Sequence, residues 1–311
     1  MEKNFKEIYE KIYNENGIKK IEKMYRKRSK NILIFFGITM LLVFIIPVSL
    51  FITIPAMIVY VIITSSKKQL EKENEYITMY KEKLVLPLLQ EIFPNSQYRP
   101  NDSLALEKYL EAEYKDNFVK VNEIDQYNSN DHIILPVKVS EEKSSYIDIY
   151  DVKLETRSHS SRNGSNRLTI YEGLTASISL PKSINTKIKL SPKIMTNFIG
   201  SSTDLNEINT NFPDFDKYFT ISAEQKELAS RIYTVDVMQK LLDILDNCNC
   251  AFNINIINDK LYVRVRGFNI FEYVIVLGND KHMHIEKSVK AVETIKELTC
   301  LIYEIIDNTD M

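Results

Sequence analysis

The stretch SYIDIYDVKLETRS, residues 145–158, alternates apolar and polar side chains, which is typical of a β-strand with one buried face. Segments with the same alternation follow one another at short intervals, separated by turns rich in Asn and Ser. Such a succession predicts a mainly antiparallel sheet. The other predicted strands are FVKVNEI (118–124), HIILPVKVS (132–140), NRLTIYEGLTASISLP (166–181), TKIKLSP (186–192) and IMTNFIG (194–200).

The pattern changes near residue 212, where a short predicted strand is followed by two predicted helices, the second with apolar residues at helical spacing as far as Leu245. AFNINIIN (251–258) and KLYVRVRG (260–267) then alternate around Asn258 and Asp259, a combination typical of a β-hairpin. Residues 285–307 again carry apolar side chains at steps of three and four, which predicts a terminal amphipathic helix. We therefore expect an α+β domain in which helices pack on the sheet.

Residues 31–66, NILIFFGITMLLVFIIPVSLFITIPAMIVYVIITSS, contain no charged side chain. A single straight helix of about 36 residues would extend about 54 Å, whereas the hydrocarbon core of a bilayer measures about 30 Å. Pro47 divides the segment, and both flanks are basic, so we predict a two-helix transmembrane hairpin with both termini in the cytosol. The alternative is one tilted helix with an interfacial remainder.

The predicted fold class is therefore α+β, with an N-terminal transmembrane hairpin followed by a soluble domain. We divide the chain into basic amphipathic N-terminal helices (1–30), the hairpin (31–66), juxtamembrane helices and a connector (67–115) and a cytosolic α+β domain (116–311). This organisation predicts a multi-pass protein of the inner (plasma) membrane. Basic residues beside the hairpin are predicted to contact the membrane surface: Lys19, Lys20, Arg26, Lys27, Arg28, Lys67 and Lys68.

Charge and cysteine content exclude some classes. The chain has 40 Lys and Arg residues against 42 Asp and Glu residues, which does not fit a dedicated nucleic-acid binder. Its three cysteines include no C-x-x-C pair, which argues against a zinc ribbon and favours a reducing compartment. Phosphate-binding glycine loops, H-E-x-x-H and calcium loops are all missing from the sequence, so no cofactor is expected.

Four short segments could carry chemistry, but for each we favour a structural interpretation. KHMHIE would place His282, His284 and Glu286 on one face if it were a strand, as a partial metal site, but we expect a loop before the last helix. Cys248 and Cys250 would need further ligands to bind a soft metal. The other two are RSHSSRNGSNR (157–167), a possible basic contact or serine nucleophile, and FPDFDKYF (212–219), where Asp214 and Asp216 could act as an acid/base pair.

The order of segments resembles the DUF3137 family of bacterial proteins, a family of unknown function. Two stretches carry the likeness: residues 215–245, and TIYEGLTASISLP (169–181), which is similar to a T-x-F-x-G strand of the family. Tyr171 here replaces the usual Phe, and Ala176 replaces a bulkier residue. The resemblance covers most of residues 31–280. It implies a membrane-anchored protein and transfers no catalytic residue.

We expect a non-enzymatic binding, scaffolding or regulatory module on the cytosolic face of the membrane. The alternatives are a membrane-tethered enzyme acting on a lipid or lipid-linked substrate and a subunit of a small transporter. The expected partners are the lipid bilayer and an unidentified protein, without sequence-specific nucleic acid, and homo-oligomerisation is left open.

Overall fold

The structure is a computed structural model of the chain. It describes residues 2–19, 74–75, 77–111, 124–138, 144–157, 167–193, 205–248, 250–267 and 281–309, with Lys23, Ile34, Gly37, Ile38 and Leu41. The chain divides into two compact units. Unit 1 comprises Met1–Ile92 and Glu272–Ile275, and unit 2 comprises Phe93–Phe271 and Val276–Met311.

Unit 1 contains helix α1 (Glu2–Glu15), a π-helical turn η2 (Lys81–Val85) and helix α5 (Leu86–Ile92). Its described helices bury Phe5, Tyr9 and Ile12 from α1 and Leu88 and Leu89 from α5, and α1 packs against α5. The helical spacing of these apolar residues explains why each helix has one buried face.

Unit 2 is built on a nine-stranded sheet in the order β1-β2-β3-β4-β9-β8-β5-β7-β6. Every paired neighbour is antiparallel, so the predicted antiparallel sheet with packed helices is confirmed. The strands are β1 (Gln97–Pro100), β2 (Gln126–Lys138), β3 (Ser144–Arg157), β4 (Arg167–Ser179), β5 (Lys187–Pro192), β6 (Asn206–Ile208), β7 (Phe219–Ala223), β8 (Phe252–Ile257) and β9 (Lys260–Arg266).

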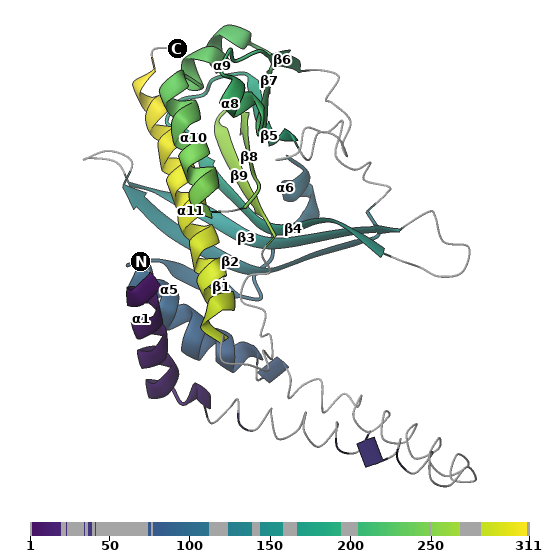
Figure 1. The fold of residues 1–311 in the computed structure, drawn as a ribbon, viewed down its shortest axis with the longest axis vertical. Helices are drawn as coiled ribbons and strands as arrows, with labels where there is room; N and C mark the ends of the chain where they lie inside the picture. Colours follow the sequence, from purple (N-terminus) through teal and green to yellow (C-terminus); the bar gives the residue numbers. More distant parts are fainter. Residues whose placement is uncertain are drawn as a thin grey trace. The chain divides into compact units, whose positions relative to one another are not determined.

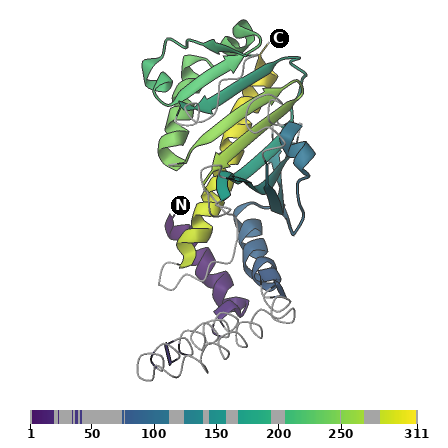
Figure 2. The same cartoon turned by 90° about the vertical axis from the view of Figure 1, so that its right-hand side faces the viewer.

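Alternation along the central strands gives the sheet one apolar face. On β9, Leu261, Val263 and Val265 are buried, and helix α11 (Lys281–Asn308) packs against β9 and β4. Helix α10 (Val235–Cys248) packs in turn against α11. Figures 1 and 2 show α11 running along this face of the sheet. The helical residues predicted from periodicity therefore complete the main core.

The opposite face is covered in part by the short helix α6 (Leu106–Glu111). Tyr109 of α6 is buried in a cluster with Val152, Leu154 and Tyr171 from strands β3 and β4. The cluster fixes α6 on the sheet, and the remaining part of this face beside α6 is polar.

Two smaller helices extend the fold near β7. Helix α8 (Pro213–Asp216) precedes β7, and helix α9 (Lys226–Ile232) follows it. Phe215, Phe219 and Phe252 form a chain of aromatic contacts, with centroid separations of 5.1 Å between neighbours. Because all three rings are buried, Phe215 and Phe219 of the segment 212–219 belong to the core.

The predicted transmembrane hairpin requires a correction. Residues 31–66 lie outside the described ranges, apart from Ile34, Gly37, Ile38 and Leu41. Within the part of the chain that the structure describes, a helix with the length and apolar character of a membrane span is not found. The longest described helix, α11, has 28 residues but carries charged side chains along its length, including Glu286, Lys290, Glu293 and Lys296.

The transmembrane part of the predicted fold class is therefore wrong on this evidence. The multi-pass inner-membrane location, which rested on the hairpin, is not supported either. The structure retains the mixed helix and antiparallel sheet. Two of the predicted strands, 118–124 and 194–200, lie outside the described residues except for Ile124.

Candidate ligand-binding site

Three neighbouring strands present polar side chains on the face of the sheet beside α6. Asp148 of β3 pairs with Ser177 of β4, which pairs on its other side with Tyr262 of β9. Residues two apart on a strand point to the same face, so the next row shares this surface. That row consists of Tyr150, Thr175 and Arg264.

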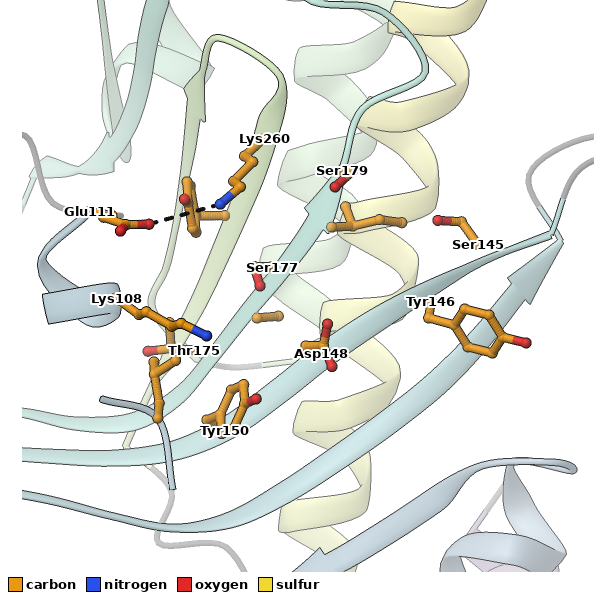
Figure 3. Close-up of a pocket in the computed structure, with 14 residues that line it drawn as sticks. Lys108, Glu111, Ser145, Tyr146, Asp148, Tyr150, Thr175, Ser177, Ser179 and Lys260 are labelled. Carbon is orange, nitrogen blue, oxygen red and sulfur yellow. Dashed lines mark ion pairs between the residues drawn. The ribbon is translucent and has the colours of Figure 1, made fainter. Parts of the chain in front are cut away.

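A pocket with a volume of about 400 Å³ opens over these rows. Figure 3 shows Lys108 and Glu111 of α6 on one side of it, with Asp148, Ser177 and Thr175 on the strands. Lys260 Nζ lies 3.8 Å from Glu111 Oε2, and both side chains are about half exposed. The sheet therefore forms the floor of the pocket and α6 forms a wall.

The lining combines hydroxyl groups, phenol rings and charges of both signs. Lys108 and Lys260 contribute positive charge, and Glu111 and Asp148 contribute negative charge, so the lining has no excess of either sign. The hydroxyl-bearing residues are Ser145, Thr175, Ser177 and Ser179, and the phenols are Tyr146, Tyr150 and Tyr262. Such a surface suits an uncharged ligand with many hydrogen-bonding groups better than an ion or a lipid tail.

The imidazole of His132, on β2, forms hydrogen bonds with two carboxylates, and one of them, Asp148, lines the pocket. Its Nδ1 is 2.9 Å from Asp102 Oδ2, and its Nε2 is 2.8 Å from Asp148 Oδ1. The imidazole is buried, whereas the two carboxylates are close to half exposed. Burial by itself would lower the pKa of His132, but hydrogen bonds with Asp148 and Asp102 outweigh it and raise the pKa.

The same contacts act on the acidic partner, because the hydrogen bond with His132 lowers the pKa of Asp102. The arrangement therefore favours an imidazolium that donates to a carboxylate on each side. The ring of His132 also stacks on Tyr150, with centroids 4.2 Å apart and an interplanar angle of 11°. Both pocket residues that contact His132, Asp148 and Tyr150, are thus held in place before a ligand binds.

The connector between β1 and α6 is tied to the sheet close to Asp102. The Leu104 N–H donates to Ser129 Oγ at 3.0 Å, and Tyr127 Oη donates to the Leu104 carbonyl at 2.8 Å. Leu104 lines the pocket. These hydrogen bonds fix the connector on the sheet, and the buried cluster around Tyr109 fixes α6. Together they position the wall of the pocket.

The buried guanidinium of Arg264, on β9, contacts Tyr109 of α6. Its Cζ lies 4.5 Å from the centroid of the Tyr109 ring, and its Nη2 donates to the Tyr109 carbonyl at 3.5 Å. Burial lowers the pKa of Arg264, and the nearby Tyr109 acts in the opposite direction. Arginine side chains keep their positive charge in proteins. The charge of Arg264 is stabilised here by the ring and the backbone carbonyl of Tyr109.

With this geometry established, comparison with known proteins gives one family. Residues 169–305 match the sequence profile of DUF3137, described as a protein of unknown function. The predicted resemblance is therefore confirmed over this range, which contains both stretches that carry it, and the range begins later than the predicted likeness over 31–280.

A search of curated protein sequences found no match. The crystal structure of the mycobacterial trehalose monomycolate transport factor A aligns with 66% of this chain and 88% of that chain, with a TM-score of 0.36 and 9% identity. Values this low transfer neither fold nor function.

The DUF3137 region begins with β4, and the structure explains the glycine in its TIYEG stretch. Gly173 has a φ of +156°, and a Cβ at this position would lie 2.2 Å from the carbonyl oxygen of Val265 on β9. Tyr171, two residues earlier, is buried against Tyr109 and donates to the Leu174 carbonyl at 2.6 Å. The pocket straddles the boundary of the region, because Ser177 and Tyr262 lie inside it and Asp148 lies outside.

The predicted metal candidates do not lie on a strand or a loop. His282, His284 and Glu286 belong to α11, which begins at Lys281. The loop expected at these residues is part of the helix, and residues two apart on a helix are separated by about 200° around its axis. Among the described residues no group of three or more His, Cys, Asp or Glu side chains could hold a metal ion.

The remaining predicted residues are scattered. Asp214 Oδ1 bonds Lys217 Nζ at 2.7 Å, and Asp216 Oδ1 accepts from Thr210 at 2.8 Å, so the two carboxylates have separate partners. Of the predicted membrane-surface residues, Lys19 is described and exposed, and their surface role stays a prediction. The other six, Lys20, Arg26, Lys27, Arg28, Lys67 and Lys68, lie outside the described residues, as do residues 158–166 of the predicted hairpin tip.

Sequence reasoning did not single out the residues that form the pocket. Asp148 and Tyr150 alternate with buried isoleucines in YIDIY, and Thr175, Ser177 and Ser179 alternate in TASIS. A run of polar side chains on one face of a central strand was the available signal. His132 had no comparable signal, because its partners come from a connector and a neighbouring strand.

Proposed function

We propose that unit 2 is a ligand-binding module whose pocket over β3, β4 and β9 takes a small, uncharged, polyhydroxylated molecule such as a mono- or disaccharide. The observation that carries the proposal is the floor row Asp148, Ser177 and Tyr262, which offers a carboxylate, a hydroxyl and a phenol to one cavity. Ligand hydroxyl groups can donate to the carboxylate and accept from the serine and the phenol.

The size and charge of the pocket support this class of ligand. A volume of about 400 Å³ falls in the usual range for small-molecule sites. Each lining carboxylate has a cationic or imidazole neighbour, Lys260 for Glu111 and His132 for Asp148. A strongly charged ligand would have to displace or compete with these pairs, whereas a neutral one would not.

Pre-organisation supports binding over chemistry. Asp148 and Tyr150 are fixed by His132, and a pocket that is already ordered loses little side-chain entropy when a ligand enters. The carboxylates serve in this proposal as hydrogen-bond acceptors for the ligand.

The experiment is titration calorimetry and thermal shift on the full chain with a panel of neutral mono- and disaccharides, with sugar phosphates and uronic acids as charged comparators. We expect at least one neutral sugar to bind. Asp148→Asn should weaken it by about tenfold or more, because a hydrogen bond to a charged acceptor contributes about 1.5–3 kcal/mol. Ser177→Ala should weaken it about fivefold.

Ser230→Ala is the matched control, since Ser230 is an exposed serine on α9 whose hydroxyl donates to the Lys226 carbonyl. This control variant should bind as the wild type does. Failure of every neutral sugar, or equal affinity for the Asp148→Asn, Ser177→Ala and wild-type chains, would overturn the proposal.

A further inference from the structure

Two cysteines meet at the junction between α10 and β8. Cys248 is the last residue of α10, and Cys250 lies two residues before Phe252, where β8 begins. Their Sγ atoms lie 2.6 Å apart, although both are free thiols. The Cys250 N–H also donates to Cys248 Sγ at 3.3 Å. The backbone thus aims one sulfur at the other within the reach of a covalent bond.

The environment divides the pair into a nucleophile and a proton donor. The hydrogen bond from Cys250 lowers the pKa of the Cys248 thiol to about 7 against the opposing effect of burial, and the backbone N–H of Cys250 and the charge of Lys290 lower it further. The same hydrogen bond and burial raise the pKa of Cys250. Cys248 is therefore the sulfur that carries negative charge near neutral pH.

We propose that Cys248 and Cys250 are a thiol–disulfide exchange site that forms an intramolecular disulfide by reaction with a low-molecular-weight disulfide such as oxidised glutathione. Cys248 thiolate attacks one sulfur of that disulfide, and one thiolate leaves. Cys250 then loses its proton to solvent and attacks the Cys248 sulfur of the mixed disulfide, which expels the second thiolate. The two protein thiols are oxidised by two electrons, and the small disulfide is reduced to two thiols.

A metal would be a poorer fit for the same pair. Tetrahedral thiolate sites take further ligands, and the described residues hold no cluster of three potential ligands. The pair also differs from Cys300, which lies on α11 and whose thiol pKa is raised mainly by burial. Cys300 therefore supplies an internal comparison in every experiment.

The product is best detected chemically. A disulfide between residues two apart closes a very short loop, so the entropic stabilisation that cross-links give to folded proteins is small here. A change in melting temperature would be a weak readout, whereas mass and alkylation measure the bond itself.

The experiment treats the full chain with oxidised glutathione, quenches with acid, alkylates the remaining thiols and maps the peptides by mass spectrometry. We expect the peptide that contains both residues to lose two hydrogens, in the wild type and in Cys300→Ser alike. In Cys250→Ser the reaction should stop at a glutathione adduct on Cys248. In Cys248→Ser the adduct on Cys250 should form more slowly than the adduct on Cys248 forms in Cys250→Ser, because burial still raises the pKa of the Cys250 thiol.

A second measurement on the wild type does not depend on any variant folding. Limited iodoacetamide should modify Cys248 before Cys300 although Cys248 is buried and Cys300 is partly exposed, because the Cys248 thiol has the lower pKa. The inference is overturned if Cys248 and Cys250 both remain fully alkylatable after oxidised glutathione, or if Cys300 is the first to react in both assays. This site is independent of the sheet-face pocket, so either proposal can fail alone.

Discussion

Replacing His132 with Phe should destabilise the protein by an amount that depends on pH. His132 makes two hydrogen bonds of 2.9 and 2.8 Å to Asp102 and Asp148, and Phe removes both while keeping a ring against Tyr150. A hydrogen bond to a charged group contributes about 1.5–3 kcal/mol. Because both carboxylates are close to half exposed and can return to water, we discount the pair to about 2–3 kcal/mol in total.

The pH dependence follows from the directions of the pKa shifts. The folded pKa of His132 is raised, so its contribution is complete below the unfolded pKa of about 6.5 and declines as pH rises through the folded pKa. The pKa of Asp102 is lowered, so its contribution is lost only as pH falls below about 3.8. Between these limits the imidazolium can donate to both carboxylates, whereas the neutral ring donates to one.

The assay is urea unfolding of the wild type and His132→Phe at about pH 5.5 and about pH 8.5. The difference in unfolding free energy should be about 2–3 kcal/mol at the lower pH and smaller by about 1 kcal/mol or more at the higher pH. A double-mutant cycle with Asp102→Asn should give a coupling energy with the same pH trend. Asp214→Asn, which removes an exposed surface pair with Lys217, is the control and should change stability little.

An equal loss at the two pH values, or a larger loss at the higher one, would refute the assignment of an imidazolium between two carboxylates. A pH-independent loss would instead indicate that the imidazole has the same protonation state at both pH values.

Four further substitutions test the fold around the pocket. Gly173→Ala should lower the unfolding free energy measured in urea by about 3 kcal/mol or more, because the new Cβ would lie 2.2 Å from the Val265 carbonyl oxygen. Gly267 has a φ of +97° but open space around it, so Gly267→Ala should lower the unfolding free energy by only about 1–2 kcal/mol. Tyr109→Leu should lower the unfolding free energy by about 2 kcal/mol, because the contacts with Tyr171 and Arg264 are lost. The same variant should bind the ligand more weakly. An unchanged affinity would show that α6 is not part of the site. Lys260→Ala, which breaks a 3.8 Å pair with Glu111 that is about half exposed, should change thermal stability by less than about 0.5 kcal/mol.

Local patterns predicted the strands and the main helices better than they predicted which of them are neighbours. Alternation identified β3, β4 and the β8–β9 hairpin, where Asn258 adopts the positive φ of 56° that the tight turn requires. Strand order is a different matter, because β4 pairs with β9, about ninety residues later in the chain. The floor of the pocket depends on that pairing, so Ser177 and Tyr262 could not be placed together from the sequence.

The sequence pattern also gave a wrong prediction where the residues have no strong preference for helix or loop. KHMHIE contains no helix-breaking residue, and the structure extends α11 through it to Lys281. The transmembrane hairpin was predicted from the apolar run 31–66, from Pro47 and from the basic flanks, whereas the helices among the described residues owe their apolar faces to packing within each unit.

Strand β4 links the family resemblance to the proposed site. Its first half, around Tyr171 and Gly173, contacts α6 and the backbone of β9, where the steric demands leave little freedom for substitution. Its second half presents Thr175, Ser177 and Ser179 to the pocket on the face opposite the residues that pack towards α11. A substitution of Ser177 changes the ligand face without opening the core, whereas one of Gly173 disturbs the pairing of three strands. We therefore expect chains that match DUF3137 over this strand to keep the glycine and to differ in the pocket, so that one sheet can present different binding surfaces.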